Sequence, residues 1–216
     1  MHISEGILPA QLCISGYGIT SLITWYSLRQ INRLPNPQAS IPKASLLTAA
    51  FFVASSIHIP IPIGSSVHLI LNGLLGTVLG YYAFPAILIG LFFQGIMFGH
   101  GGLTTLGINA LIMGIPAILA YQIFQLRHVV GKGIRENLSM RIFGFIAGAS
   151  AIGVSSLIFF SLIITNLPSG FDGSLEQKAI YGLMISHIPL MVIEGILTAM
   201  VVSFLHRVMP KLLPNN

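Results

Sequence analysis

Four of the seven histidines lie within the first hundred residues, and their side chains suggest a metal site. They are His2, His58, His68 and His100. Neutral imidazole is a good ligand for Ni²⁺, Co²⁺, Cu²⁺ and Zn²⁺. The chain has five Asp and Glu residues and one cysteine, so it is otherwise poor in metal ligands. If the fold brings these histidines together, we expect them to bind a transition-metal ion.

The first two residues could chelate such an ion together. The α-amine of Met1, the backbone nitrogen of His2 and the His2 imidazole can close fused chelate rings with three nitrogens in one plane. One further imidazole would complete a square-planar set, which suits Ni(II) or Cu(II), is compatible with low-spin Co(II) and disfavours Zn(II). Residues 1–28 contain no Lys or Arg, unlike a secretory signal, and the bulky second residue favours retention of Met1.

Signatures of the common enzymes are absent from the sequence. The pair Gly131-Lys132 lacks the upstream glycine of a phosphate-binding loop, and no His-Glu-x-x-His pair occurs. Cys13 is the single cysteine, so it cannot form an internal disulfide. We therefore expect neither enzymatic activity nor ATP hydrolysis by this chain.

The composition indicates a membrane protein. Hydrophobic residues make up 54% of the 216 residues and charged residues 7%, with a mean hydropathy of +0.88; soluble domains have about 25% charged residues. A membrane-spanning helix needs about 20 apolar residues, so the chain is long enough for about seven spans. The net charge of +5 comes without a basic tract interleaved with aromatics, so we expect it to set membrane orientation and not to bind nucleic acid.

The positions of the charged residues predict the topology. Nine of the ten Lys and Arg residues lie in 29–43, 127–141 and 207–211, so these stretches are expected on the cytoplasmic side. No charged residue occurs in the 83 residues of 44–126, a length that suits four crossings. The prediction is one all-α transmembrane domain over 1–216, with an extracytoplasmic N-terminus, a cytoplasmic C-terminus and a metal-capping segment at 1–9. The predicted spans are 6–28, 44–60, 67–82, 84–99, 103–124, 142–167 and 180–205.

Two alternatives within this topology stay open. The third and fourth spans are short, so the stretch around 65–80 could be partly re-entrant. The topology also places His2, His58, His68 and His100 at the outer face, where each could instead be a polar group at the level of the lipid headgroups.

Glu194 lies inside the last predicted span, seven residues after His187. A carboxylate at that depth is costly and usually faces the interior of a helix bundle. Its two candidate roles are a hydrogen bond between helices and participation in transport or subunit contacts. A membrane redox or metalloenzyme subunit would need paired histidines at matched depth, and His187 is the only deep one.

Three motifs resemble one known family. They are the opening MHISEGILP (1–9), the turn GSSVH (64–68) and the run GHGGLTTLGIN (99–109), and the likeness continues over 188–198. These stretches are similar to the CbiM/NikM family, the substrate-binding membrane components of energy-coupling-factor nickel and cobalt importers. The resemblance covers nearly the whole chain.

The resemblance implies a site and partners. The transported ion, Ni²⁺ or Co²⁺, would be held by the Met1 amine, the amide and side chain of His2, and His68, without any permanent cofactor. The protein would lie in the cytoplasmic membrane of a prokaryote. Energy would come from a separate transmembrane coupling (T) subunit and cytoplasmic ATPases, in some systems with a small extra membrane subunit. A permease that works without ATPases is the alternative.

The choice of metal and the residues around the ligands are less constrained. Cobalt members of the family carry a turn like SCSHPTGTG, where this chain reads SVHLILNG over 66–73, so the metal is left open, with a slight preference for nickel. A ligating histidine usually donates its other ring N–H to a neighbouring acceptor. Glu5, Asn72 and His100 are the candidates for the ligands' second shell of contacts, although Glu5 could instead cap the first helix.

Overall fold

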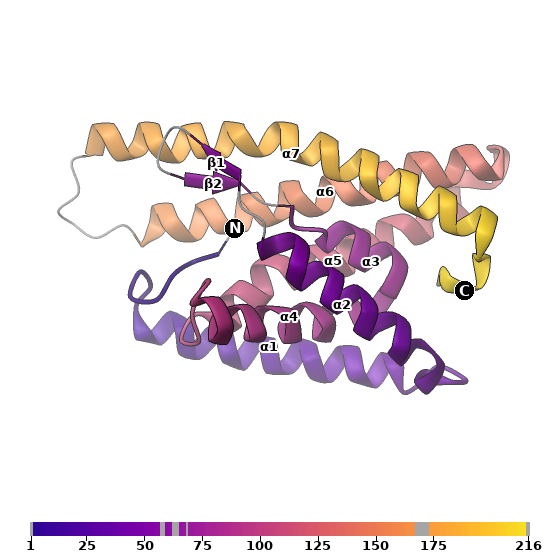
Figure 1. The fold of residues 1–216 in the computed structure, drawn as a ribbon, viewed down its shortest axis with the longest axis horizontal. Helices are drawn as coiled ribbons and strands as arrows, with labels where there is room; N and C mark the ends of the chain where they lie inside the picture. Colours follow the sequence, from indigo (N-terminus) through magenta and orange to yellow (C-terminus); the bar gives the residue numbers. More distant parts are fainter. Residues whose placement is uncertain (1, 57–58, 62–64, 68, 167–172, 215–216) are drawn as a thin grey trace.

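The computed structural model describes residues 2–56, 59–61, 65–67, 69–166 and 173–214. These residues form seven α-helices and one short antiparallel hairpin, in which Ile59 pairs with Val67 (Figure 1). The predicted all-α class is confirmed. The helices are α1 (Ala10–Ile31), α2 (Ile41–Ser56), α3 (Asn72–Leu79), α4 (Ala83–Phe98), α5 (Leu106–Gln125), α6 (Glu136–Thr165) and α7 (Gly173–Val208), and the hairpin strands are β1 (Ile59–Ile61) and β2 (Ser65–Val67).

Four helical stretches of the described chain are long and apolar enough to cross a membrane by length and composition. They are Asn72–Phe98, Leu106–His128, Glu136–Thr165 and Met184–Val208. Seven crossings, and the sides on which the termini lie, stay predictions.

The predicted span 67–82 differs most from the structure. Strand β2 ends at Val67, and α3 has eight residues, about 12 Å of helix, which is too short for a hydrocarbon core of about 30 Å. Positive φ values at Leu71 (55°) and Gly80 (60°) interrupt the helix at both ends. Helix α3 therefore covers only part of the predicted span 67–82, and both the crossing and the re-entrant alternative stay predictions. Each of the other six predicted spans overlaps one α-helix.

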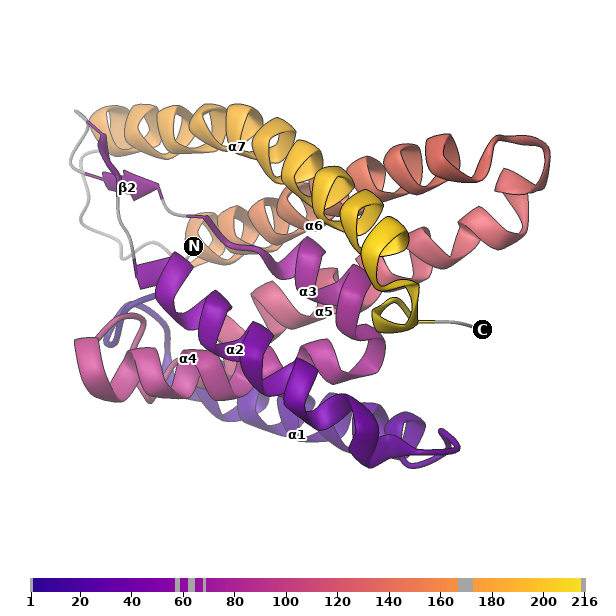
Figure 2. The ribbon, with the colours of Figure 1, turned by 45° about the vertical axis from the view of Figure 1, so that its right-hand side comes forward.

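Helix α5 lies at the centre of the fold, packed against α1, α3, α4 and α6. Glycine allows the closest of these approaches: a Cβ at Gly76 of α3 would lie 2.0 Å from the carbonyl oxygen of Ala117 on α5. The long helices α6 and α7 run side by side in opposite directions (Figures 1 and 2). The N-terminal segment, the hairpin and the loop between α4 and α5 lie toward one end of the molecule, and the C-terminus toward the other (Figure 2).

Candidate metal site

The segment before α1 is anchored to α5 through the backbone of Ile3. The Ile3 N–H donates to Asn109 Oδ1 at 2.9 Å, and the Ile3 carbonyl accepts from Asn109 Nδ2 at 3.0 Å and from Thr105 Oγ1 at 2.8 Å. All three residues are buried. Both backbone polar groups of Ile3 are thus satisfied by side chains at the start of α5, which holds the neighbouring His2 in place.

A chain of hydrogen bonds determines which nitrogen of His2 carries the proton. Ser55 Oγ donates to the carbonyl of Phe51, so its oxygen accepts from Gln94 Nε2. This orients the amide of the buried Gln94 so that its Oε1 faces His2 Nε2, 3.1 Å away. Because an amide oxygen only accepts, His2 Nε2 is the protonated nitrogen. The lone pair then lies on Nδ1, the nitrogen that can close a six-membered chelate ring with the backbone nitrogen of His2.

His100 lies beside His2 at the end of α4. The two ring centroids are 4.3 Å apart and the planes meet at 68°. The next residue, Gly101, has φ of +86°, and a Cβ there would lie 3.3 Å from His2 Cδ2 and 3.0 Å from Asn109 Nδ2. Glycine therefore provides both the backbone conformation and the space that bring the two imidazoles together.

Glu5 fastens the N-terminal segment to the loop between α4 and α5. Its Oε1 accepts hydrogen bonds from the backbone N–H groups of Leu103 at 2.8 Å and Thr104 at 3.2 Å. A Cβ at Gly102, where φ is +110°, would lie 2.1 Å from Glu5 Cγ. Glu5 does not cap α1, because its carboxylate binds the chain just ahead of α5.

The two other predicted polar residues meet at the start of α3. Asn72 Nδ2 donates to the carbonyl of Met113 on α5 at 3.2 Å and to Ser155 Oγ on α6 at 2.8 Å. Glu194 of α7 is fully buried, and its Oε1 accepts from the backbone N–H groups of Ile70 at 2.6 Å and Leu71 at 2.9 Å. These contacts join three long helices to α3 and to the two residues before it, and a part for Glu194 in transport or subunit contacts stays a prediction.

Met1, His58 and His68 lie outside the described residues, so the predicted ligand set is represented by His2 alone. No group of three His, Cys, Asp or Glu side chains that could hold a metal occurs in the part of the chain that the structure describes. Sequence reasoning missed Gln94 and Asn109 as site residues. Both are amides inside the uncharged stretch 44–126, where an amide side chain needs a buried partner, and that signal could have identified them.

The chain is similar to known metal transport proteins over almost its whole length. A family model described as "Cobalt uptake substrate-specific transmembrane region", CbiM, matches residues 2–212. A protein of Haemophilus influenzae described as a putative metal transport protein is 33% identical over 213 residues, which cover 99% of this chain and 97% of that protein. A putative fused cobalt transport protein CbiMQ of Methanocorpusculum labreanum is 33% identical over 231 residues, 97% of this chain and 36% of that protein.

The fold has also been seen before. A crystal structure described as that of a transition metal transporter superposes with a TM-score of 0.75 and 27% identity, over 96% of this chain and 93% of the other. The match of the family model over almost the whole chain, the relatives and the shared fold lead to one conclusion. The chain belongs to the CbiM family and is a membrane component of a cobalt or transition-metal uptake transporter, not an enzyme.

Proposed function

We propose that this chain is the substrate-binding component of an ATP-driven importer of the energy-coupling-factor type, with Ni²⁺ or Co²⁺ as its cargo. The ion is held by the α-amine of Met1, the backbone nitrogen and Nδ1 of His2, and the imidazole of His68. The single observation that carries the proposal is the hydrogen bond from His2 Nε2 to Gln94 Oε1.

That hydrogen bond is the kind a metal-ligating histidine makes. Ligating imidazoles almost always donate the other ring N–H to a carboxylate, a carbonyl or water, which sets the tautomer and the orientation of the ring. Gln94 supports the ring in this way, and the bonds from Asn109 and Thr105 hold the adjoining Ile3 peptide. Such pre-organisation favours tight capture of the ion, because less ordering is needed on binding.

Two arguments concern which metal ion is carried, and they favour different ions. The name of the family model and that of the fused relative specify cobalt. A planar set of nitrogens suits Ni(II) and is compatible with low-spin Co(II). Both ions are therefore candidates, and affinity measurements with each decide between them.

The partners are proposed on chemical grounds and on one relative. This chain has no phosphate-binding loop, so in an ATP-driven importer the ATP is hydrolysed by cytoplasmic ATPases on other chains. The fused CbiMQ relative joins a region similar to this chain to a further region. This supports a transmembrane coupling subunit that acts with the present chain in the cytoplasmic membrane of a prokaryote; a small additional membrane subunit is an optional partner.

The test is metal binding by the purified protein and by a variant with the four residues Gly-Ser-Gly-Ser inserted between Met1 and His2. We expect the insertion to weaken Ni²⁺ and Co²⁺ binding at least about 100-fold, because it breaks the fused rings while leaving every imidazole present. His128→Ala, at a histidine far along the chain from the proposed ligands, is the matched control and should bind as the parent does. Unchanged affinity of the insertion variant would overturn the N-terminal site.

A second experiment tests the energy source. Uptake of radioactive metal into cells that express this chain should require co-expression of the coupling subunit and the ATPases. Equal uptake by this chain alone would identify it as an ATPase-independent permease.

A further inference from the structure

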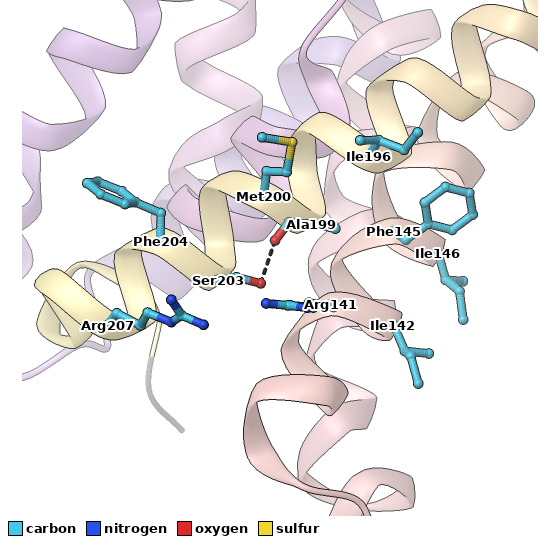
Figure 3. Close-up of a pocket in the computed structure, with 10 residues that line it drawn as sticks. All are labelled: Arg141, Ile142, Phe145, Ile146, Ile196, Ala199, Met200, Ser203, Phe204 and Arg207. Carbon is cyan, nitrogen blue, oxygen red and sulfur yellow. Dashed lines mark hydrogen bonds between the residues drawn. The ribbon is translucent and has the colours of Figure 1, made fainter.

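A groove of about 610 Å³ lies between α6 and α7, away from the candidate metal site (Figure 3). Most of its wall is apolar, and the only charged side chains that line it are two arginines. The lining residues are Arg141, Ile142, Phe145, Ile146, Ile196, Ala199, Met200, Ser203, Phe204 and Arg207.

The two arginines lie at the same end of the groove. Figure 3 shows the guanidinium groups of Arg141 and Arg207 directed toward each other below Ser203. Neither makes an ion pair with a carboxylate in the described part of the chain, where Glu136 pairs with His206 at 3.5 Å. Two facing cations without an acid between them repel each other, and an anion placed between them removes that repulsion.

The depth of this arginine pair matches the headgroup region of a bilayer. Helix α6 has 30 residues and is about 45 Å long, so a centred helix extends about 7 Å beyond a 30 Å hydrocarbon core at each end. Arg141 is the sixth residue of α6, and Arg207 lies in the last turn of α7. Both side chains therefore project at the membrane surface that the distribution of Lys and Arg predicts to be cytoplasmic.

The other side chains that line the groove can make van der Waals contacts with a ligand but donate no hydrogen bond to it. Phe145, Ile146, Ile196 and Met200 are exposed, so hydrocarbon can lie against them. The Ser203 hydroxyl donates its hydrogen to the carbonyl of Ala199 at 2.6 Å, as the dashed line in Figure 3 shows. The charge in the groove thus comes from the arginine pair alone, with an apolar channel leading away from it.

We propose that this groove binds one anionic phospholipid. The phosphate lies between Arg141 and Arg207, where the guanidinium groups donate charge-assisted hydrogen bonds, and an acyl chain runs along the apolar wall between α6 and α7. Basic pockets between transmembrane helices on the cytoplasmic side are suited to acidic headgroups. The site is separate from metal capture, so it stands or falls independently of the proposed cargo.

The test is lipid retention measured by native mass spectrometry on the whole chain, extracted from membranes and washed with phosphatidylglycerol or phosphatidylethanolamine. We expect one phosphatidylglycerol to be retained by the parent, and about tenfold less by an Arg141→Gln/Arg207→Gln variant. The control Arg33→Gln/Arg135→Gln removes the same charge outside the groove and should retain lipid normally. Met200→Trp should also reduce retention, because it fills the apolar channel and keeps both arginines.

Four results would overturn the proposal. The first is equal retention of phosphatidylglycerol by the groove variant and its control, and the second is equal retention of phosphatidylethanolamine by the parent. The third is full displacement of the lipid by glycerol 3-phosphate, which would identify a site for a free anion. In the fourth, the groove variant keeps its lipid and loses a co-purifying coupling subunit, which would make the groove a protein interface.

Discussion

The carboxylate of Glu194, inside α7, accepts a 2.6 Å hydrogen bond from the backbone N–H of Ile70, 124 residues away in sequence. The same oxygen accepts from the N–H of Leu71, which immediately precedes α3. In an apolar interior these two N–H groups would otherwise lack a partner, because they precede α3 and take no part in its internal hydrogen bonds. Glu194 therefore joins the start of the short helix α3 to the longest helix of the protein.

Two replacements of Glu194 should distinguish how much stability is lost with the hydrogen-bond acceptor from how much is lost with the charge. Glu194→Leu leaves two buried N–H groups without an acceptor, and we expect a loss of stability of about 1–3 kcal/mol for each. Glu194→Gln keeps an oxygen at the same position and should cost markedly less. Thermal unfolding in detergent measures both, with Glu136→Gln, at an exposed position, as the control. A Leu variant as stable as the Gln variant would show that the two hydrogen bonds contribute nothing.

Gln94 should affect metal affinity through His2. Gln94→Leu removes the acceptor that orients the imidazole, and loss of such a partner typically costs 10–100-fold in metal affinity. Gln94→Glu keeps an acceptor and should retain binding. Titration with Ni²⁺ and Co²⁺ measures the effect. The matched control is Gln122→Leu, at an exposed amide near the C-terminal end of α5. Parent-like affinity of the Leu variant would remove Gln94 from the site.

Gly102→Ala should displace Glu5 from its loop. The new Cβ would lie 2.1 Å from Glu5 Cγ, and φ at this position is +110°. We expect weaker metal binding and easier proteolysis of the first residues, because the two hydrogen bonds from Leu103 and Thr104 to Glu5 are broken. Gly18→Ala in α1 meets no atom within 4 Å and should behave as the parent. Identical proteolysis of the two variants would contradict this role for Glu5.

Metal affinity should fall as the pH is lowered. An α-amine has an ordinary pKa of about 8 and an imidazole about 6.5, and a metal must displace the proton of each protonated ligand. We therefore expect affinity to decrease about tenfold or more per pH unit below pH 8, and more steeply below pH 6.5. Calorimetric titrations between pH 6 and 8.5 measure the slope. A flat profile over that range would exclude the Met1 amine as a ligand.

The sequence by itself determined the class of the protein and the chemistry of its first two residues. Apolar content and the spacing of charged residues are local properties, and they suffice to predict an all-helical membrane domain because a bilayer leaves few other solutions. Likewise, the chelating capacity of Met1 and His2 depends on covalent connectivity alone. All seven predicted spans overlap α-helices for the same reason, although α3 covers only part of the span 67–82.

Only the tertiary structure decided what surrounds those residues. His2 meets Gln94 across 92 residues and Ile3 meets Asn109 across 106, and no local pattern encodes such pairs. The sequence indicated that the stretch around 65–80 could be partly re-entrant, but the ends of α3 depend on the backbone turns at Leu71 and Gly80, which the sequence did not predict. Which hydrogen bonds form between distant segments depends on how the helices pack, because a buried polar group bonds to the partner that the fold places next to it.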